Sequence, residues 1–165
     1  MNHSKLSFEL ATTDDLPILE EIRSQAFVPI FESFRNILGE TIYEAAQLQE
    51  DLAQADLLKS YLEPSSVWQL WAVRQTSLMV GFVSIRLDSD QRVGEIGLNA
   101  VHPKVGGQGI GTQMYEFAVA EMKRAGMKVA TVATGGDPAH LPARKAYRKA
   151  GFEVEIPSVW MCREL

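Results

Sequence analysis

The sequence predicts a single α/β domain over residues 1–165, in which a mixed but mostly antiparallel central sheet is flanked by helices. Three strand patterns follow one another between residues 67 and 101 with only short polar turns between them, which is typical of an antiparallel meander. Helical patterns precede this meander and alternate with further strand patterns after it. A chain of 165 residues also buries enough surface to form one hydrophobic core without disulfide bonds.

The chain before the meander is predicted to hold one strand and a long helical region. Residues 6–12 alternate apolar and polar side chains, as a strand buried on one face does. The polar residues 13–15 can cap a helix that runs over 16–27. The stretch 30–62 also has a helical composition and is broken near Gly39. We therefore expect helices to connect the first strand to the meander.

The meander consists of strands over 67–73, 77–88 and 92–101, the first two of which form a hairpin. Gly97 lies inside the third strand, where a glycine indicates a bulge or the close approach of another backbone. The alternative is a small residue that lies under a neighbouring side chain. Both interpretations stay open at this point.

The chain after the meander alternates helix and strand. An apolar helical face covers 110–126 and stops at a glycine, 128–134 has a strand composition, and 142–151 is again helical. The segments 152–156 and 158–165 are rich in strand-forming residues and flank a proline. They predict a closing hairpin at the C-terminal end of the sequence.

Composition excludes several classes of protein. The only cysteine, Cys162, rules out an internal disulfide, and no apolar run reaches the roughly 20 residues needed to span a bilayer, so we expect a cytoplasmic protein without membrane partners. The formal net charge of −5 argues against a nucleic-acid partner. The three histidines, His3, His102 and His140, show no metal-ligand spacing, so no metal is expected.

A glycine-rich loop precedes the helix that begins at residue 110. Gly106, Gly107, Gly109 and Gly111 leave backbone N–H groups uncovered at the positive end of this helix, which is the arrangement of an anion site. A phosphate loop of the Walker type would need a lysine before Thr112, and the sequence has none there. A dinucleotide fingerprint would need different glycine spacing and an acidic residue after the next strand. The loop therefore predicts pyrophosphate binding of another kind.

Two segments resemble the GNAT superfamily of N-acyltransferases. The segment from Val101 to Thr112 looks like the family's acyl-CoA loop, and that from Pro142 to Phe152 looks like its A-x-x-x-Y-x-x-x-G-F helix and turn. The sequence departs from the family at Gly106, where Gln or Arg is usual, and at His140, where Asn is frequent, which removes a side-chain contact but leaves the backbone cradle. The resemblance implies the family's fold and acetyl-CoA as the acyl donor. It implies CoA contacts from Asn99, Ala100, Val101, Gly106, Gly107, Gln108, Gly109, Ile110, Gly111, Thr112 and His140.

Acyl transfer to a primary amine needs a base, because an amine with a pKa of about 10.4 is protonated at neutral pH. Glu95 lies where some GNAT enzymes carry a catalytic glutamate, and the alternative is a solvent-facing side chain on a half-exposed strand. Strand alternation places Glu95, Gly97, Asn99 and Val101 on one face unless a bulge intervenes. In the resembled family such a bulge separates this strand from the next and frees an N–H for the carbonyl oxygen.

Tyr147 is the candidate acid that protonates the departing thiolate, as the matching tyrosine does in many GNAT enzymes. It shares the inner stripe of its helix with Ala143, Ala146 and Ala150, so a core aromatic is the alternative. The basic residues of the same helix take the outer positions and could hold an anion as a group: Arg144, Lys145, Arg148 and Lys149.

The resembled fold would place residues 27–39 and the closing hairpin around the acceptor. Phe31, Glu32 and Phe34 suggest a cationic acceptor with an apolar part, such as a polyamine, an aminoglycoside or a lysine, although surface charge explains the glutamate equally well. The sequence thus predicts an enzyme that moves an acetyl group from acetyl-CoA to a primary amine by direct attack. The alternatives are a transferase for longer acyl chains and a CoA-binding sensor without turnover. Dimers are frequent in the resembled family, so a homodimer is possible.

Overall fold

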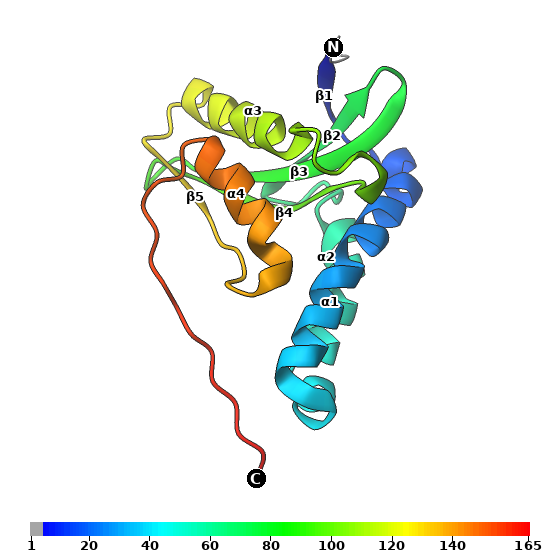
Figure 1. Ribbon diagram of the computed structural model, residues 1–165. Helices are drawn as coiled ribbons and strands as arrows, with labels where there is room; N and C mark the ends of the chain where they lie inside the picture. Colours follow the sequence, from blue (N-terminus) through cyan, green and yellow to red (C-terminus); the bar gives the residue numbers. More distant parts are fainter. Residues whose placement is uncertain (1–4) are drawn as a thin grey trace.

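A five-stranded sheet forms the centre of the computed structural model, which describes residues 5–165 (Figure 1). The strands lie in the order β1-β2-β3-β4-β5, with antiparallel pairing from β1 to β4 and parallel pairing between β4 and β5. The mixed, mostly antiparallel sheet of the predicted fold class is therefore confirmed. The strands are β1 (Leu6–Leu10), β2 (Trp68–Gln75), β3 (Leu78–Asp88), β4 (Val93–Val101) and β5 (Val129–Val132).

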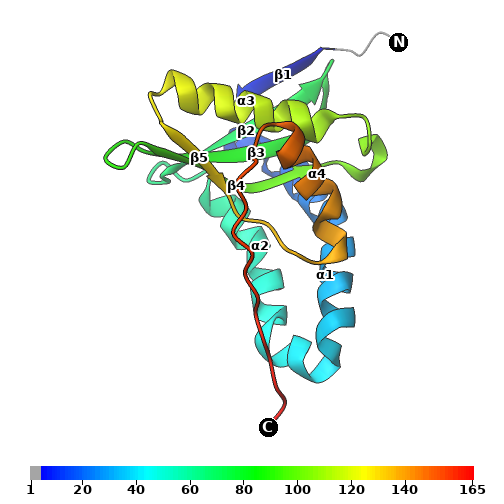
Figure 2. The ribbon, with the colours of Figure 1, turned by 60° about the vertical axis from the view of Figure 1, so that its left-hand side comes forward.

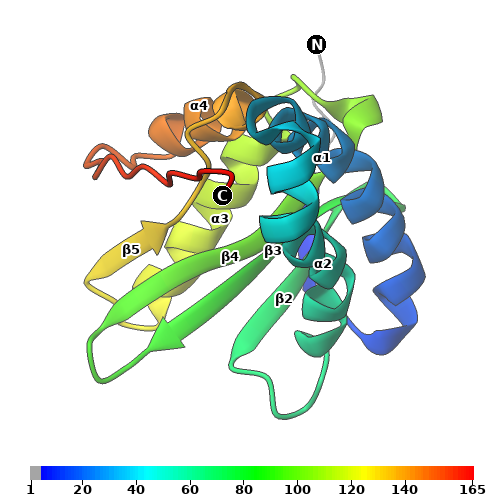
Figure 3. The ribbon, with the colours of Figure 1, turned by 90° about the horizontal axis from the view of Figure 1, so that it is seen from below.

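Two pairs of helices cover the two faces of the sheet, as the view from below shows (Figure 3). One face carries α1 (Leu16–Ala46) and α2 (Leu48–Ser60), and the other carries α3 (Ile110–Arg124) and α4 (Leu141–Lys149). Three short 3₁₀ helices complete the elements: η1 (Thr13–Asp15), η2 (Pro103–Val105) and η3 (Pro138–His140). Within the described chain, no helix is long and apolar enough to cross a membrane.

The helix pair α1 and α2 extends beyond the sheet (Figure 2). Helix α1 continues through Pro29, where the composition had suggested two separate helical stretches. The break predicted near Gly39 is present, because this residue has φ 72° and ψ 164° and kinks α1 there. Only the sheet-proximal part of the helix pair contributes to the core, through residues such as Leu19, Ile22 and Leu58.

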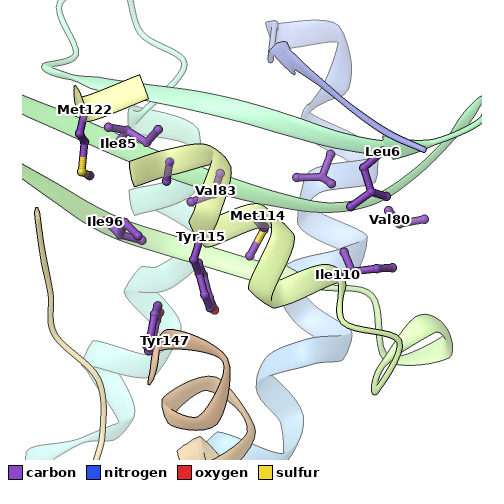
Figure 4. Packing of buried hydrophobic residues seen from close by; sticks show 12 residues of the cluster. Leu6, Val80, Val83, Ile85, Ile96, Ile110, Met114, Tyr115, Met122 and Tyr147 are labelled. Atoms are coloured by element: carbon purple, nitrogen blue, oxygen red, sulfur yellow. The ribbon is translucent and has the colours of Figure 1, made fainter. Parts of the chain in front are cut away.

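The second core cluster fills the space between the sheet and α3 and α4 (Figure 4). Ile110, Met114, Ala118 and Met122 project from one side of α3 and are almost fully buried, which confirms the predicted apolar face. The predicted helix end is also confirmed, since Gly126 has φ 81° and follows the last turn of α3. Glycine adopts this left-handed conformation without the steric cost that other residues meet.

The predicted closing hairpin is wrong. Residues 152–165 form no strand and run as an extended tail (Figure 1), with Val154 93% and Ile156 91% exposed. The start of the tail is held against α4 instead, because Phe152 packs on Tyr147 and Glu155 forms an ion pair with Arg148. Alternation alone predicted strands here, but a strand also needs a partner edge. The hairpin therefore contributes no wall to the acceptor cleft.

Candidate active site

A groove of about 490 Å³ lies between α1, the end of β4, the glycine loop, the start of α3 and α4. Most of the residues predicted to contact CoA line it: Asn99, Ala100, Val101, Gly106, Gly107, Gly109, Ile110, Gly111 and Thr112. Gln108 and His140, which were also predicted to do so, lie outside its lining. Helix α1 supplies the opposite wall, including Ala26, Phe27 and Ile30, which the sequence analysis did not assign to the CoA site.

The glycine loop directs backbone N–H groups into this groove. Gly109 caps α3 with φ 80°, and a Cβ there would meet no atom within 4 Å. The conformation of the backbone, rather than a lack of space, therefore requires glycine at this position. The first hydrogen bond of α3 runs from the Gln113 N–H to the Gly109 carbonyl, so the amides of Ile110 to Thr112 have no acceptor within the helix. Free amides beside the positive end of a helix dipole are the arrangement in which proteins bind anions.

Two of the four cations of α4 line the same groove. Lys145 and Lys149 reach it from one side of the helix, one turn apart. Arg148 binds Glu155 instead, and Arg144 donates to the backbone carbonyls of Gly135 and Asp137. The predicted anion-holding group therefore divides into two groove residues and two structural residues.

Tyr147 is 5% exposed and lies beside Tyr115 from α3, with ring centroids 4.1 Å apart (Figure 4). Asn99 joins the two hydroxyl groups: the Tyr115 hydroxyl donates to Asn99 Oδ1 at 2.8 Å, and Asn99 Nδ2 donates to the Tyr147 oxygen at 3.0 Å. Burial raises the pKa of Tyr147, and hydrogen bonding within the cluster with Tyr115 and Asn99 offsets only part of this rise. Burial, followed by the proximity of Tyr147, raises the pKa of Tyr115 well above its ordinary value. Tyr115 was not predicted as a site residue from the sequence, although it lines the groove.

Glu95 lies on the opposite face of the sheet from Tyr147. Its carboxylate forms an ion pair with Arg86 of β3, and this guanidinium lies over the Trp68 ring at 5.3 Å from the centroid. The prediction that Glu95 and Asn99 share one face is therefore wrong. The reason is a bulge in β4, which changes the strand's alternation between these two residues.

The bulge itself is confirmed and lies at Gly97 and Leu98. Val83 pairs with Asn99 whereas Ile85 pairs with Ile96, so β4 has one extra residue opposite β3. Pairing between β4 and β5 ends at Ile96, which leaves the remainder of β4 without a partner on that edge. A Cβ at Gly97 would overlap the Trp68 ring, so a bulge and close side-chain packing both require glycine here.

The residues predicted to contact the acceptor lie on α1. Phe31 packs edge-on against Phe27, Phe34 lies 5.9 Å from the ring of His140, and Glu32 is exposed. These three side chains do not line the groove. They form part of the helix that covers one side of it.

His140 takes part in a polar cluster that links α1 to the loop before α4. Asp137 accepts a hydrogen bond from Ser33 at 2.8 Å and contacts the His140 ring nitrogen. Burial would raise the pKa of Asp137, but the hydrogen bonds from Ser33 and His140 outweigh it, so the pKa is lowered. His140 therefore positions the loop rather than lining the groove. His3 lies outside the described residues, and across 5–165 no group of three or more His, Cys, Asp or Glu side chains could hold a metal ion.

A parallel strand pair that separates at a bulge, next to an anion-binding loop at a helix start, defines the class of acyl-CoA-dependent acyltransferases. The sequence profile described as "Acetyltransferase (GNAT) family" matches residues 31–152. The chain therefore belongs to the GNAT acetyltransferase family. No curated protein matches its sequence.

Solved structures of other proteins have the same fold. The ribosomal-protein-S18-alanine N-acetyltransferase of Escherichia coli superposes with a TM-score of 0.66 at 15% identity, covering 92% of this chain and 80% of that one. A GNAT acetyltransferase of Brucella melitensis in complex with acetyl-CoA gives 0.62 at 15% identity, covering 92% and 85%. An aminoglycoside acetyltransferase from an uncultured soil metagenomic sample, in complex with sisomicin, gives 0.60 at 15% identity, covering 97% and 96%.

Proposed function

We propose that this protein transfers an acetyl group from acetyl-CoA to a primary amine. The observation that supports this most directly is the groove, in which unpaired amides at the start of α3 and the ammonium groups of Lys145 and Lys149 face the same space. A pyrophosphate is doubly charged and rich in acceptor oxygens, so it suits this combination of donors and cations. The Brucella melitensis protein of the same fold was solved with acetyl-CoA.

In this proposal the thioester lies where β4 and β5 separate. Glu95 is one residue before the end of the strand pairing and faces one side of the sheet, whereas Tyr147 belongs to the other side. A carbonyl carbon in the gap would therefore have a base on one side and an acid on the other. Backbone N–H groups in 97–99 would stabilise the oxyanion, because the bulge releases this part of β4 from pairing with β5.

The proton transfers follow from these positions. Glu95 accepts a proton from the amine, directly or through water, so that the nitrogen lone pair can attack the carbonyl carbon. The new C–N bond forms, the C–S bond breaks, Tyr147 donates its proton to the sulfur, and the second proton that the nitrogen must lose to become an amide passes to solvent. Solvent returns a proton to Tyr147 and removes the one held by Glu95. The net products are the amide and free CoA.

The acceptor is proposed to be a cationic amine with an apolar part. Phe31, Glu32 and Phe34 remain the candidate contacts, because α1 covers the side of the groove that faces η3. Proteins of the same fold acetylate an alanine of ribosomal protein S18 or bind sisomicin, which shows how far acceptors vary on this fold. Longer acyl donors, or CoA sensing without turnover, are the alternatives.

Thiol release from acetyl-CoA, measured with a panel of polyamines, aminoglycosides and lysine derivatives, tests the proposal. We expect amine-dependent release by the wild type and a decrease of about one to three orders of magnitude in kcat for Tyr147→Phe, with similar CoA affinity. Thermal stabilisation by CoA without amine-dependent release would favour the sensor. Full activity of Tyr147→Phe would leave this tyrosine with a packing role only.

A further inference from the structure

We propose that Asn99 and Tyr115 are positioning residues for Tyr147, and that they direct its hydroxyl proton away from the protein and toward the CoA sulfur. This inference rests on the proposed function, since it assumes that Tyr147 is the acid. It assigns to Asn99 a task other than contact with CoA, and it gives a role to Tyr115. The direction of each hydrogen bond in this cluster follows from which atoms can donate and which can only accept.

The Gly97 carbonyl determines the orientation of the Asn99 amide. Asn99 Nδ2 lies 2.8 Å from the Gly97 oxygen, and a carbonyl oxygen can only accept a hydrogen bond. The amide nitrogen must therefore be on this side, and Oδ1 must be on the other side, where the Tyr115 hydroxyl donates to it at 2.8 Å. The Tyr115 hydroxyl can donate or accept, so it is compatible with this orientation, which the Gly97 carbonyl fixes.

This orientation makes the Tyr147 oxygen an acceptor. Asn99 Nδ2 donates to it at 3.0 Å with the second hydrogen of the same amide group. Asn99 Oδ1 and the Gly97 oxygen each already accept from another donor, and the third acceptor of the cluster, the Tyr115 oxygen, has no hydrogen bond from Tyr147. Throughout 5–165, no hydrogen bond uses the Tyr147 proton as its donor. Tyr147 itself does not line the groove, but Asn99 and Tyr115 do, so the cluster reaches the groove wall and the uncommitted proton is left for a ligand there.

Accepting a hydrogen bond also makes the phenol a better acid. A donor at the phenol oxygen favours the phenolate that remains after the proton has left. Burial raises the pKa of Tyr147, and the neighbouring Tyr115 and Asn99 lower it again. The same pair of residues thus orients the proton and partly offsets the effect of burial on its release.

The β4 bulge brings Asn99 to this cluster. If β4 alternated regularly through Gly97 and Leu98, Asn99 would face the same side as Glu95 and could not reach the two tyrosines. The bulge therefore has two consequences, because it separates β4 from β5 and also supplies the hydrogen-bond partner of Tyr147. The tyrosine rings are held by their mutual stacking and by Phe152, whose centroid lies 5.8 Å from that of Tyr147.

The pKa of the thiol of bound CoA tests this inference without an acceptor. The thiolate absorbs in the ultraviolet, so its titration can be followed in the complex of the enzyme with CoA. A hydroxyl that donates to the thiolate lowers this pKa, and we expect Tyr147→Phe to raise it by about one to two units, the value of a hydrogen bond to a charged group. Tyr115→Phe and Asn99→Leu should each raise it by about half a unit, because the Tyr147 proton is then less well directed.

A double-mutant cycle separates positioning from packing. If Tyr115 acts through the Tyr147 hydroxyl, Tyr115→Phe has no further effect on the thiol pKa in the Tyr147→Phe background. An equal shift in both backgrounds would overturn the inference. Phe152→Leu is the matched control, since Phe152 touches the same ring without a hydroxyl, and it should leave the thiol pKa unchanged. A shift in this control as large as that of Tyr115→Phe would also overturn the inference.

The outcomes distinguish the inference from the proposed function. If Tyr147→Phe leaves the thiol pKa unchanged, the assignment of Tyr147 as the acid is wrong. If Tyr147→Phe raises it while the Asn99 and Tyr115 variants do not, the acid is retained and the positioning role is wrong. Tyr115→Phe keeps the stacked ring, so it provides the test even where Asn99→Leu fails to fold.

Discussion

Replacing Gly109 by valine perturbs the anion site without adding or removing a charge. Gly109 caps α3 with φ 80°, a conformation that a β-branched residue almost never adopts. A Cβ at this position would meet no atom within 4 Å, so backbone strain rather than a clash of the Cβ is the expected perturbation. The loop must instead relax to a negative φ, which turns the N–H groups that precede the helix away from the groove.

The size of the effect follows from this backbone strain. A non-glycine residue in the left-handed region costs about 1–2 kcal/mol, and binding must restore that conformation before the amides face the pyrophosphate. The dissociation constant for CoA should therefore rise by at least about 5- to 30-fold. Isothermal titration of CoA into the folded variant measures this change directly.

Gly126→Val is the matched control, because Gly126 has φ 81°, an equally open surrounding and no contact with the groove. It should lower the melting temperature of the protein while leaving the dissociation constant for CoA unchanged. Wild-type affinity for CoA in folded Gly109→Val would refute the assignment of the loop as the pyrophosphate site. An equal loss of affinity in Gly126→Val would show that strain in this fold acts globally.

Two further predictions concern charges near the groove. Exchanging both Lys145 and Lys149 for glutamine should weaken CoA binding by about 2- to 30-fold at low salt and less at high salt, whereas the exposed pair Lys123 and Lys128 should tolerate the same exchange. Titration calorimetry at two salt concentrations decides this, and equal losses for both pairs would contradict it. Asp137 has a lowered pKa, so its ionised form stabilises the fold above about pH 4, and this stabilisation is lost as the pH falls through the lowered value. The melting temperature of Asp137→Asn should accordingly lie below that of the wild type at neutral pH, and the difference should shrink in acid; a constant difference would contradict the assignment.

Features that depend on residues close together in the chain could be predicted from the sequence. Runs of strand-forming residues between polar turns located the strands of the meander, apolar periodicity located the buried side of α3, and glycines marked the kink in α1 and the start and end of α3. The glycine loop predicted an anion site because its backbone conformation and the helix that follows are local properties. Most of the residues assigned to CoA from this loop and from β4 line the groove.

Features that depend on a distant partner could be assigned only from the contacts in the folded protein. The bulge was anticipated at Gly97, but its pairing with β3 determined that Asn99 faces Tyr147 while Glu95 faces Arg86. Residues 152–156 alternate like a strand, yet the tail forms no strand. Alternation describes a side-chain pattern and does not supply an edge to pair with. The partners of Arg144 and Arg148 lie only seven to nine residues away, but the groove that Lys145 and Lys149 line is formed with α1 and the glycine loop, which are distant in sequence. Such choices depend on contacts between segments far apart in sequence, and local propensity carries no information about those contacts.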